Sequence, residues 1–151
     1  MNTDKKRFHY LARGVIFVDG KVLLAHQIKA DNTFLPGGHI EHGENAKTAL
    51  IREIEEELGM TPLVGRFIGA VEHAWVDAFD NHEINLLFEV VISGLDASVA
   101  PQSQEGHLEF IWSRPEDLEF HNLLPKPMIK CLKLLANTDT AYWGSSIGEW
   151  T

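Results

Sequence analysis

Apolar runs in the first third of the chain predict β-strands separated by short turns. Tyr10 to Val18 and Lys21 to His26 are rich in β-forming residues and meet at Asp19-Gly20, a strong hairpin signal. We expect these two segments to pair as antiparallel strands. A shorter extended piece, Thr33 to Leu35, ends at Pro36 and leads the chain into two glycines.

The first helical pattern runs from about Asn45 to Leu58. Leu50, Ile54 and Leu58 recur every four residues, which places them on one face of a helix. Asn45 is suited to the N-cap, and Gly59 is typical of a left-handed stop after the last turn. The pattern predicts a helix with one buried stripe.

A second hairpin is predicted after this helix. Leu63 to Val76 and Glu83 to Ser93 are expected to pair across the polar turn DAFDNHE, with Asp80-Asn81 at its tip. Trp75 and Phe79 flank that turn, where an aromatic ring could stack on a base of a ligand. More often such residues close one end of a core, and we favour that interpretation for Phe79.

The remainder predicts a loop, a short strand and a terminal helix. Gly94 to His107 has few bulky apolar residues and is expected to be a loop. Glu109 to Ser113 predicts a strand, and Pro127 opens a helix that ends near Leu135. Strands on both sides of a central helix, with a second helix at the end, predict an α/β fold in which a mixed β-sheet lies between helices.

Composition narrows the class of protein and of partner. The 151 residues are expected to form a single domain over 1–151, with 44% hydrophobic and 23% charged residues. A net charge of -9 argues against a nucleic-acid duplex or an anionic membrane as the main partner. No apolar run reaches membrane-spanning length, and the start MNTDKKRFHY lacks the apolar core of a secretion signal.

The single cysteine and the tryptophans of the tail add two expectations. Cys131 excludes an intramolecular disulfide and fits a reducing compartment, so we expect a cytoplasmic protein. Trp143 and Trp150 lie in a glycine- and serine-rich tail that the pattern does not place. Packing against a second subunit, as a homodimer, is one interpretation.

Three carboxylates share one face of the first helix. Glu53, Glu56 and Glu57 stand at i, i+3 and i+4, next to the apolar stripe. Their mutual repulsion and the helix dipole each oppose this arrangement by about 0.3 kcal/mol or more. A solvated acidic face is the usual outcome of a charge run. A divalent hard cation such as Mg²⁺ or Mn²⁺ would instead compensate the repulsion, and we favour that interpretation.

The stretch from Gly38 to Met60 resembles the signature of the Nudix hydrolase family. The positions that match are Gly38, Glu44, Arg52, Glu53, Ile54, Glu56, Glu57, Gly59 and Met60. Nine constrained positions within 23 residues are far more specific than a lone glycine-rich loop. The resemblance implies an α/β/α sandwich with this helix packed on the sheet. It also implies an Mg²⁺-dependent hydrolase, for which Mn²⁺ could substitute, of a nucleoside diphosphate linked to another group.

The resemblance and the chemistry together suggest metal ligands. Hydrolysis of a pyrophosphate bond needs neutralised phosphoryl oxygens and an oriented water, and a divalent metal provides both. We expect Glu53, Glu56 and Glu57 to be ligands, with the carbonyl of Gly38 added by resemblance.

Arg52 and three further residues are expected to support this site. Arg52 either contacts phosphate or forms an ion pair with Glu44, which in relatives is thought to brace the loop. Gly37 and Gly59 supply permissive backbone before the loop and after the helix.

Two residues are candidates for the general base. Glu53 could deprotonate the water, whereas in parts of the family a glutamate on a later loop does so. Glu105, in the loop before the last strand, is the candidate here. A surface loop charge is an equally good interpretation of Glu105.

The histidines invite a zinc interpretation that their spacing does not favour. His39, His42, His73, His82 and His107 form no typically spaced zinc pair, and no cysteine pair accompanies them. His39 and His42 are expected to be phosphate-side donors at most.

The sequence leaves the substrate open. About sixteen residues beyond the signature, where relatives that act on ADP-ribose tend to carry proline and those that act on dinucleoside polyphosphates tyrosine, this chain has Val76, Asp77 and Ala78. A nucleoside triphosphate, ADP-ribose or a nucleotide sugar would each suit the family. Two classes of function follow, an active nucleotide pyrophosphohydrolase and a nucleotide-sensing domain without catalysis. The intact carboxylate set favours the enzyme, because a pure binder has no need of repelling carboxylates.

Overall fold

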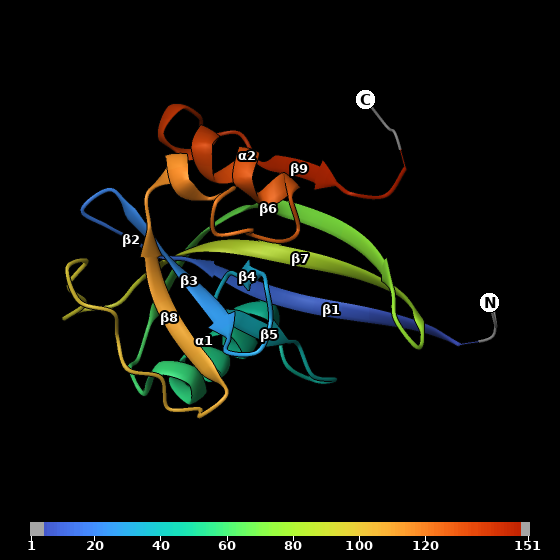
Figure 1. Ribbon diagram of the computed structural model, residues 1–151, viewed down its shortest axis with the longest axis horizontal. Coiled ribbons are helices and arrows are strands. Elements are labelled where there is room, and N and C mark those ends of the chain that lie inside the picture. The colour runs from blue at the N-terminus through green and yellow to red at the C-terminus, as the bar shows by residue number, and fades with distance from the viewer. Residues whose placement is uncertain (1–4, 149–151) are drawn as a thin grey trace.

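The computed structural model describes residues 5–148, which form two β-sheets flanked by helices (Figure 1). In chain order the elements are β1 (Lys6–Val15), β2 (Phe17–Val18), β3 (Lys21–Gln27), β4 (Thr33–Phe34), β5 (Gly37–His39), α1 (Ala46–Leu58), β6 (Leu63–Val76), β7 (Asp80–Val91), β8 (Leu108–Ser113), α2 (Pro127–Leu134) and β9 (Tyr142–Ser145). Short 3₁₀ turns cover Pro115–Asp117 and Leu135–Asn137.

The larger sheet is mixed, and the smaller one is built around β3. The five strands of the larger sheet run in the order β5-β1-β7-β6-β9, with β1 parallel to β7 and β6 parallel to β9. In the smaller sheet β3 pairs antiparallel with β2 and β4 on one edge and with β8 on the other. α1 lies on one side of the sheets and α2 on the other, so the expected α/β/α sandwich is confirmed (Figure 1).

Alternating side chains divide the interior into two cores. Along β3, Val22 and Leu24 face a cluster that includes Met128 and Leu132 of α2, whereas Leu23 faces the cluster of α1. This alternation follows from the two-residue period of a strand. Leu50, Ile54 and Leu58, the predicted stripe of α1, are all buried in the second cluster.

The predicted first hairpin was wrong over most of its length. The turn at Asp19-Gly20 is present, with φ values of 50° and 77°, but only Phe17–Val18 pairs with β3. The chain leaves the first strand at Ile16, and β1 pairs instead along its whole length with β7. The local turn signal was right; the partner of β1 comes from more than 70 residues away.

The second hairpin is confirmed, with a shifted turn. β6 and β7 pair as far as Val76 and Asp80, so the turn is residues 77–79 and not the predicted Asp80-Asn81. The carboxylate of Asp77 accepts hydrogen bonds from the amide of Phe79 at 2.7 Å and from Asn81 Nδ2 at 2.8 Å. Asn81 is therefore part of β7, where it pairs with Trp75, and not of the turn.

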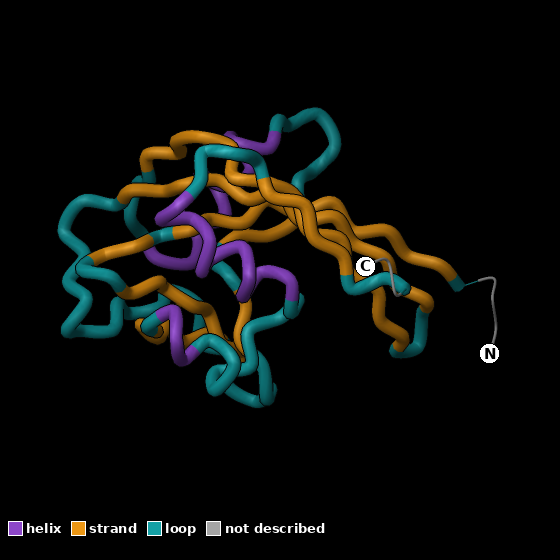
Figure 2. Tube along the Cα trace, turned by 90° about the horizontal axis from the view of Figure 1, so that it is seen from above, coloured by secondary structure: helices purple, strands orange, loops and turns teal. Residues whose placement is uncertain are grey.

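Phe79 does not close a core. It belongs to neither hydrophobic cluster, and its ring lies 3.5 Å from the guanidinium carbon of Arg7. The turn that carries Phe79 lies at the end of the β6–β7 ribbon, beyond both helices, which removes it from the apolar interior (Figure 2).

The tail that the pattern did not place contains β9. This strand pairs with β6 at the edge of the larger sheet, and Trp143 on it is 61% exposed. Trp150 lies outside the described residues. Cys131 is buried on α2.

Candidate functional site

The capped ends of α1 fix where its acidic face begins and ends. Asn45 Oδ1 accepts a hydrogen bond from the backbone N–H of Thr48 at 2.9 Å. At the other end Gly59 has φ 67° and donates its N–H to the carbonyl of Glu55. Both caps agree with the sequence-based prediction.

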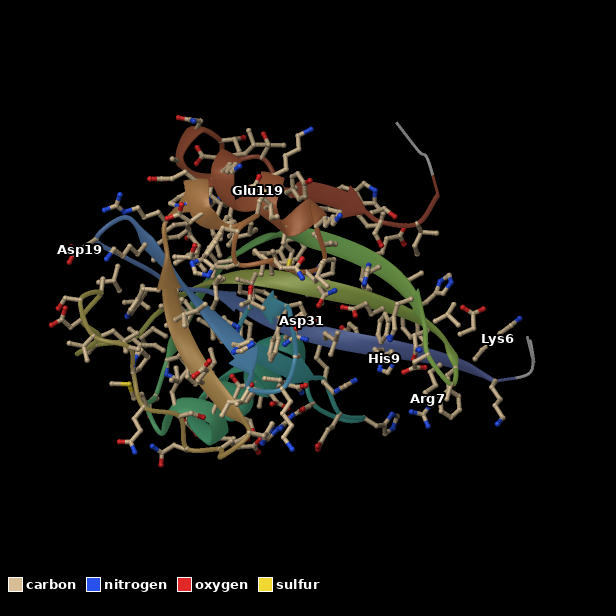
Figure 3. The ribbon with its side chains drawn as sticks, viewed as in Figure 1. Lys6, Arg7, His9, Asp19, Asp31 and Glu119 are labelled. Atoms are coloured by element: carbon tan, nitrogen blue, oxygen red, sulfur yellow. The ribbon has the colours of Figure 1, made fainter. Side chains whose placement is uncertain are left out.

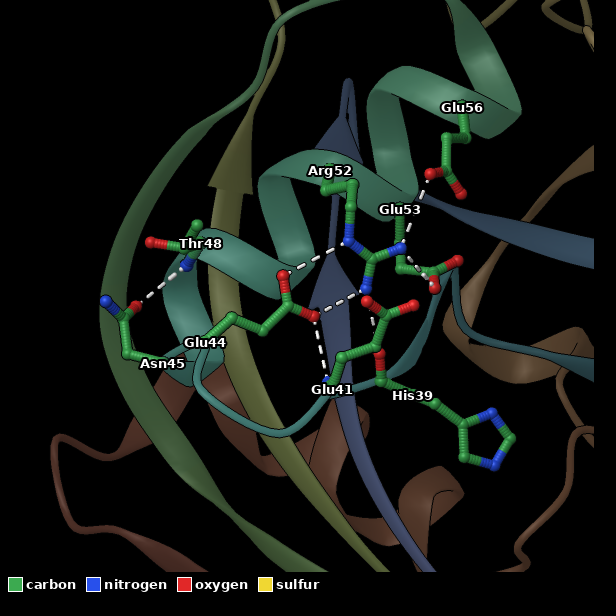
Figure 4. A network of polar contacts seen from close by, with 8 residues as sticks. All are labelled: His39, Glu41, Glu44, Asn45, Thr48, Arg52, Glu53 and Glu56. Atoms are coloured by element: carbon green, nitrogen blue, oxygen red, sulfur yellow. Dashed lines mark hydrogen bonds and ion pairs between the residues drawn. The ribbon is translucent and has the colours of Figure 1, made fainter.

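Arg52 joins the loop before α1 to the carboxylates on it (Figure 4). Its Nη2 and Nε donate to the two carboxylate oxygens of Glu44 at 2.6 and 3.2 Å. Nη1 donates to Glu53 at 3.0 Å, and Nη2 also donates to the carbonyl of His39 at 3.1 Å. The structure therefore contains the Arg52–Glu44 ion pair, a two-point contact of the strong charge-assisted kind.

Glu53 and Glu57 line a cleft of about 680 Å³ together with Gly37 and Gly38. Burial raises the pKa of Glu53, against the opposing effect of Arg52. Burial also raises the pKa of Glu57, to about 8, and the charge of Arg13 opposes this shift. Burying a carboxyl group whose pKa is raised in this way lowers the stability of the fold when the group is ionised. Groups with strongly shifted pKa values are common in functional sites.

The remaining residues of the predicted ligand set lie differently. Glu56 is half-exposed and does not line the cleft; its Oε1 accepts a bond from Arg52 at 3.4 Å. Among residues 5–148 no three acidic, histidine or cysteine side chains already stand in a metal-binding arrangement.

The donors nevertheless fit a divalent hard cation. Glu57 Oε2 is buried without a hydrogen-bond partner in the described part of the chain, and unpartnered buried oxygens are rare in proteins. The carboxylate of Glu53 lies so close to Gly38 that a Cβ there would stand 2.5 Å from its Cδ. Carboxylate oxygens thus line the cleft beside Gly38, and oxygen is the donor that Mg²⁺ and Mn²⁺ prefer.

Arg13 is a residue of this cleft that sequence reasoning missed. Its Nε donates to Asn85 Oδ1 at 3.3 Å and its Nη1 to the carbonyl of Leu35 at 3.1 Å. Burial lowers the pKa of Arg13, while the charges of Glu83, Glu57 and Glu53 raise it. A buried guanidinium facing carboxylates is suited to an anionic ligand. The sequence signal that could have identified Arg13 is its position two residues after Leu11 and four after His9, on the same face of a strand.

Glu105 is brought to the cleft by a loop anchored on α1. The N–H of Gln104 donates to the carbonyl of Glu57 at 2.8 Å, and the N–H of Glu105 donates to Ser103 Oγ. Glu105 lines the cleft, and its charge adds to the rise in the pKa of Glu57. The loop that precedes β8 is therefore next to the carboxylates of the helix.

Beyond the carboxylates, the cleft is lined by histidines and Trp75. His9 lies on the part of β1 that extends past both helices (Figure 3). The rings of His9 and His73 each stack with Trp75, at centroid distances of 5.2 and 5.6 Å. His39 Nε2 lies 2.9 Å from His9 Nδ1. Sequence reasoning named Trp75 and His39 for the substrate and missed His9 and Glu83, because only the register of β1, β7 and β6 brings them together.

The sequence model of the NUDIX domain matches residues 8–135. The chain belongs to the Nudix family. That match contains every element from β1 to α2 except the first residues of β1. The prediction that residues 1–151 form a single domain stays a prediction.

Two relatives share parts of this Nudix chain. The ADP-ribose pyrophosphatase of Methanocaldococcus jannaschii is 32% identical over 97 residues, which are 61% of this chain and 56% of that protein. The 8-oxo-dGTP diphosphatase of Escherichia coli is 43% identical over 47 residues, 31% of this chain and 35% of that protein. The matched parts thus span little more than half the length of the first relative and about a third of the second.

Solved structures agree with the Nudix fold. The solution structure of the E. coli ORF135 protein superposes with a TM-score of 0.63 at 24% identity, covering 91% of this chain and 96% of that one. A MutT NUDIX hydrolase from Burkholderia pseudomallei has a TM-score of 0.61 at 26% identity, covering 74% and 87%.

The residues at the positions of the relatives' substrate markers do not line the cleft in this chain. They lie at the β6–β7 turn and are Val76, Asp77 and Ala78. Over the described residues, no helix combines the length and the apolar character that crossing a membrane would require.

Proposed function

We propose that this Nudix domain hydrolyses a pyrophosphate bond in a small nucleotide, a nucleoside diphosphate linked to another group, with Mg²⁺ or Mn²⁺. The observation that carries the proposal is one cleft that contains the carboxylates of buried Glu57 and partly buried Glu53 together with the guanidinium of Arg13. Carboxylates and a guanidinium in one cleft suit phosphates that are bound both through a metal and through the guanidinium.

In this proposal Glu53, Glu57 and the carbonyl of Gly38 hold the metal, with Glu56 completing the set after it leaves Arg52. The bound metal would neutralise phosphoryl oxygens and lower the pKa of water. Arg52 keeps Glu44 and the loop in place, and its bond to Glu53 orients that carboxylate. Gly37 and Gly59 allow the backbone turns on which this geometry depends.

The proton of the attacking water passes to a carboxylate of the chain. Glu53 and Glu105 both line the cleft, which supports them as the two candidates for this role. Arg13 binds phosphate oxygens in the same cleft. Trp75 and His39 contact the group beyond the phosphates.

The setting of the protein is part of the same proposal. The ligand is a small molecule and not a nucleic-acid duplex or a membrane, as the charge of -9 suggests. A cytoplasmic location is supported by the one buried, free cysteine. A homodimer through the tail near Trp143 is the remaining proposal for a partner.

A panel of nucleotides tests the activity. Nucleoside triphosphates, oxidised nucleotides, ADP-ribose, nucleotide sugars and dinucleotides are incubated with Mg²⁺ and resolved by chromatography. We expect at least one of them to yield a nucleoside monophosphate, and the E57Q variant to lose that activity. The alternative, a nucleotide-sensing domain, would bind a member of the panel with no product in either protein.

A further inference from the structure

The cleft continues past the carboxylates over three residues that the proposed reaction does not use. The register pairs His9 with Glu83 across β1 and β7, and Glu83 with His73 across β7 and β6. Residues opposite one another in a sheet point to the same face, so these three side chains form one row, called here the distal row. All three line the cleft.

The distal row is held in place from several sides. Asn81 donates its amide to Asp77 and to the carbonyl of Phe79, so its Oδ1 accepts from His9 Nε2 at 2.9 Å. Ser146, just after β9, is hydrogen-bonded to His73 Nδ1. Side chains fixed in this way form a preformed binding surface.

Glu83 is tied to the phosphate side of the cleft through one intermediate. Arg13 donates to Asn85 Oδ1, and Asn85 Nδ2 donates to Glu83 Oε2. No described residue donates to Glu83 Oε1. Glu83 therefore presents an acceptor to the cleft, next to the guanidinium expected to bind phosphate.

The charge of the distal row is unfavourable for a phosphate. Burial lowers the pKa of His73, which leaves its ring neutral at pH 7. The two ring nitrogens of His9 are engaged by Asn81 and His39, so this ring has no free donor for a phosphate oxygen. A phosphate bound here would face the carboxylate of Glu83.

We propose that the distal row binds a neutral, hydroxyl-bearing sugar on the far side of the pyrophosphate, so that sugar-linked nucleoside diphosphates are better substrates than nucleoside triphosphates. This inference rests on the proposed function. Hydroxyl groups would donate to Glu83 and form hydrogen bonds with His73 Nε2, the ring nitrogen that Ser146 does not engage. His9, whose two ring nitrogens are engaged by Asn81 and His39, would pack its ring against the sugar, and the ring of Trp75 supports both imidazoles. The third phosphate of a nucleoside triphosphate would instead meet the repulsion of Glu83.

Substrates that share a nucleoside diphosphate but differ beyond it test the inference. We would measure kcat/KM for ADP-ribose and for ATP with the wild type, with E83Q, and with E89Q as an exposed control on the same strand. The wild type should prefer ADP-ribose at least about tenfold. Because a hydrogen bond to a charged group is lost, E83Q should reduce kcat/KM for ADP-ribose by about tenfold to hundredfold while that for ATP stays equal or rises. E89Q should change neither.

Three results would overturn the proposal. The first is a wild type that prefers ATP, and the second is an E83Q variant that loses both activities by the same factor. The third is a dependence of kcat/KM on the base of the substrate. If replacing adenine by hypoxanthine changes kcat/KM of the wild type but not of E83Q, the base and not the sugar lies on the distal row.

Binding separates this inference from the proposed function. With metal chelated, calorimetry should show that the wild type binds ADP-ribose at least about tenfold more tightly than ADP. The E83Q variant should bind ADP-ribose and ADP with equal affinity. That difference without hydrolysis of any nucleotide would reject the proposed function and keep the sugar subsite. Equal affinities of the wild type for both ligands would reject the subsite whether or not hydrolysis occurs.

Discussion

Gly38 and Glu53 touch so closely that no other residue fits at position 38 without moving the carboxylate. A Cβ at Gly38 would lie 2.5 Å from Cδ of Glu53 and 2.6 Å from its Oε2. The atoms in contact are the far end of a flexible side chain, so the fold can yield there. The backbone of Gly38 is not in the left-handed region, unlike that of its neighbour Gly37.

The G38A variant should therefore fold normally and lose activity. Displacing the Glu53 carboxylate by about 1 Å should lower kcat about a hundredfold, while urea unfolding should show a loss of stability below about 1 kcal/mol. The matched variant G37A should behave in the opposite way. Its φ of 136° and a Cβ 2.1 Å from the carbonyl oxygen of Ala12 should destabilise the fold strongly. A G38A protein that keeps full activity would show that the position of Glu53 is not critical.

The second prediction concerns pH and metal at Glu57. Its pKa is raised from 4.5 to about 8, so the folded state keeps a proton that the unfolded chain releases. Stability without metal is then fully present below pH 4.5 and falls as pH rises through about 8, by a few kcal/mol at about 1.4 kcal/mol per pKa unit.

Melting temperatures measured from pH 5 to 9 in EDTA would check the sign. E57Q should remove most of this pH dependence, whereas E55Q, an exposed control on the same helix, should keep it. Mg²⁺ must displace the proton, so the rise in melting temperature that it causes should grow with pH. No metal-dependent shift at millimolar Mg²⁺, together with an E56Q variant no more stable than the wild type, would contradict the ligand assignment.

The third prediction separates ligand from base. A residue that only accepts the proton of water should lose about a hundredfold or more of turnover on change to glutamine while metal still binds. E53Q and E105Q are the variants to compare, by kcat and by the Mg²⁺ concentration that half-saturates the thermal shift. Equal and small losses in both would exclude either residue as the base.

The fourth prediction concerns the guanidinium of Arg13. R13K keeps the charge but loses the planar fork that donates to Asn85 and Leu35. We expect kcat/KM to fall by about tenfold to hundredfold, with a native-like far-ultraviolet circular dichroism spectrum. R66K, which alters an exposed ion pair with Glu89, is the matched control and should leave kcat/KM unchanged. Equal effects of the two variants would place Arg13 outside the phosphate site.

The fifth prediction concerns the bond that is cut. The lining of the described cleft contains no serine or cysteine, and each of its four histidines is engaged: His9 with His39, His73 with Ser146, and His107 with Glu105. We therefore expect direct attack of water on phosphorus. Hydrolysis in ¹⁸O-labelled water should place the label in a phosphate-containing product, as mass spectrometry would show. A trapped phosphorylated protein would falsify direct attack.

The sequence by itself determined the helix and its chemistry. The positions of Asn45 and Gly59, and the stripe of Leu50, Ile54 and Leu58, are local signals within one helix, so spacing alone placed them. The same spacing put Glu53 and Glu57 beside the buried stripe. The Asp19-Gly20 turn was equally predictable, because its left-handed backbone depends on two adjacent residues.

Only the tertiary structure decided what surrounds those carboxylates. Parallel pairing of β1 with β7 joins residues more than 70 positions apart, and no local pattern specifies such a partner. That pairing brings Arg13 to Asn85 and His9 to Glu83, while the pairing of β6 with β9 brings Ser146 to His73. The carboxylates proposed to hold the metal thus belong to one helix, whereas the rest of the cleft exists only because distant strands share a sheet.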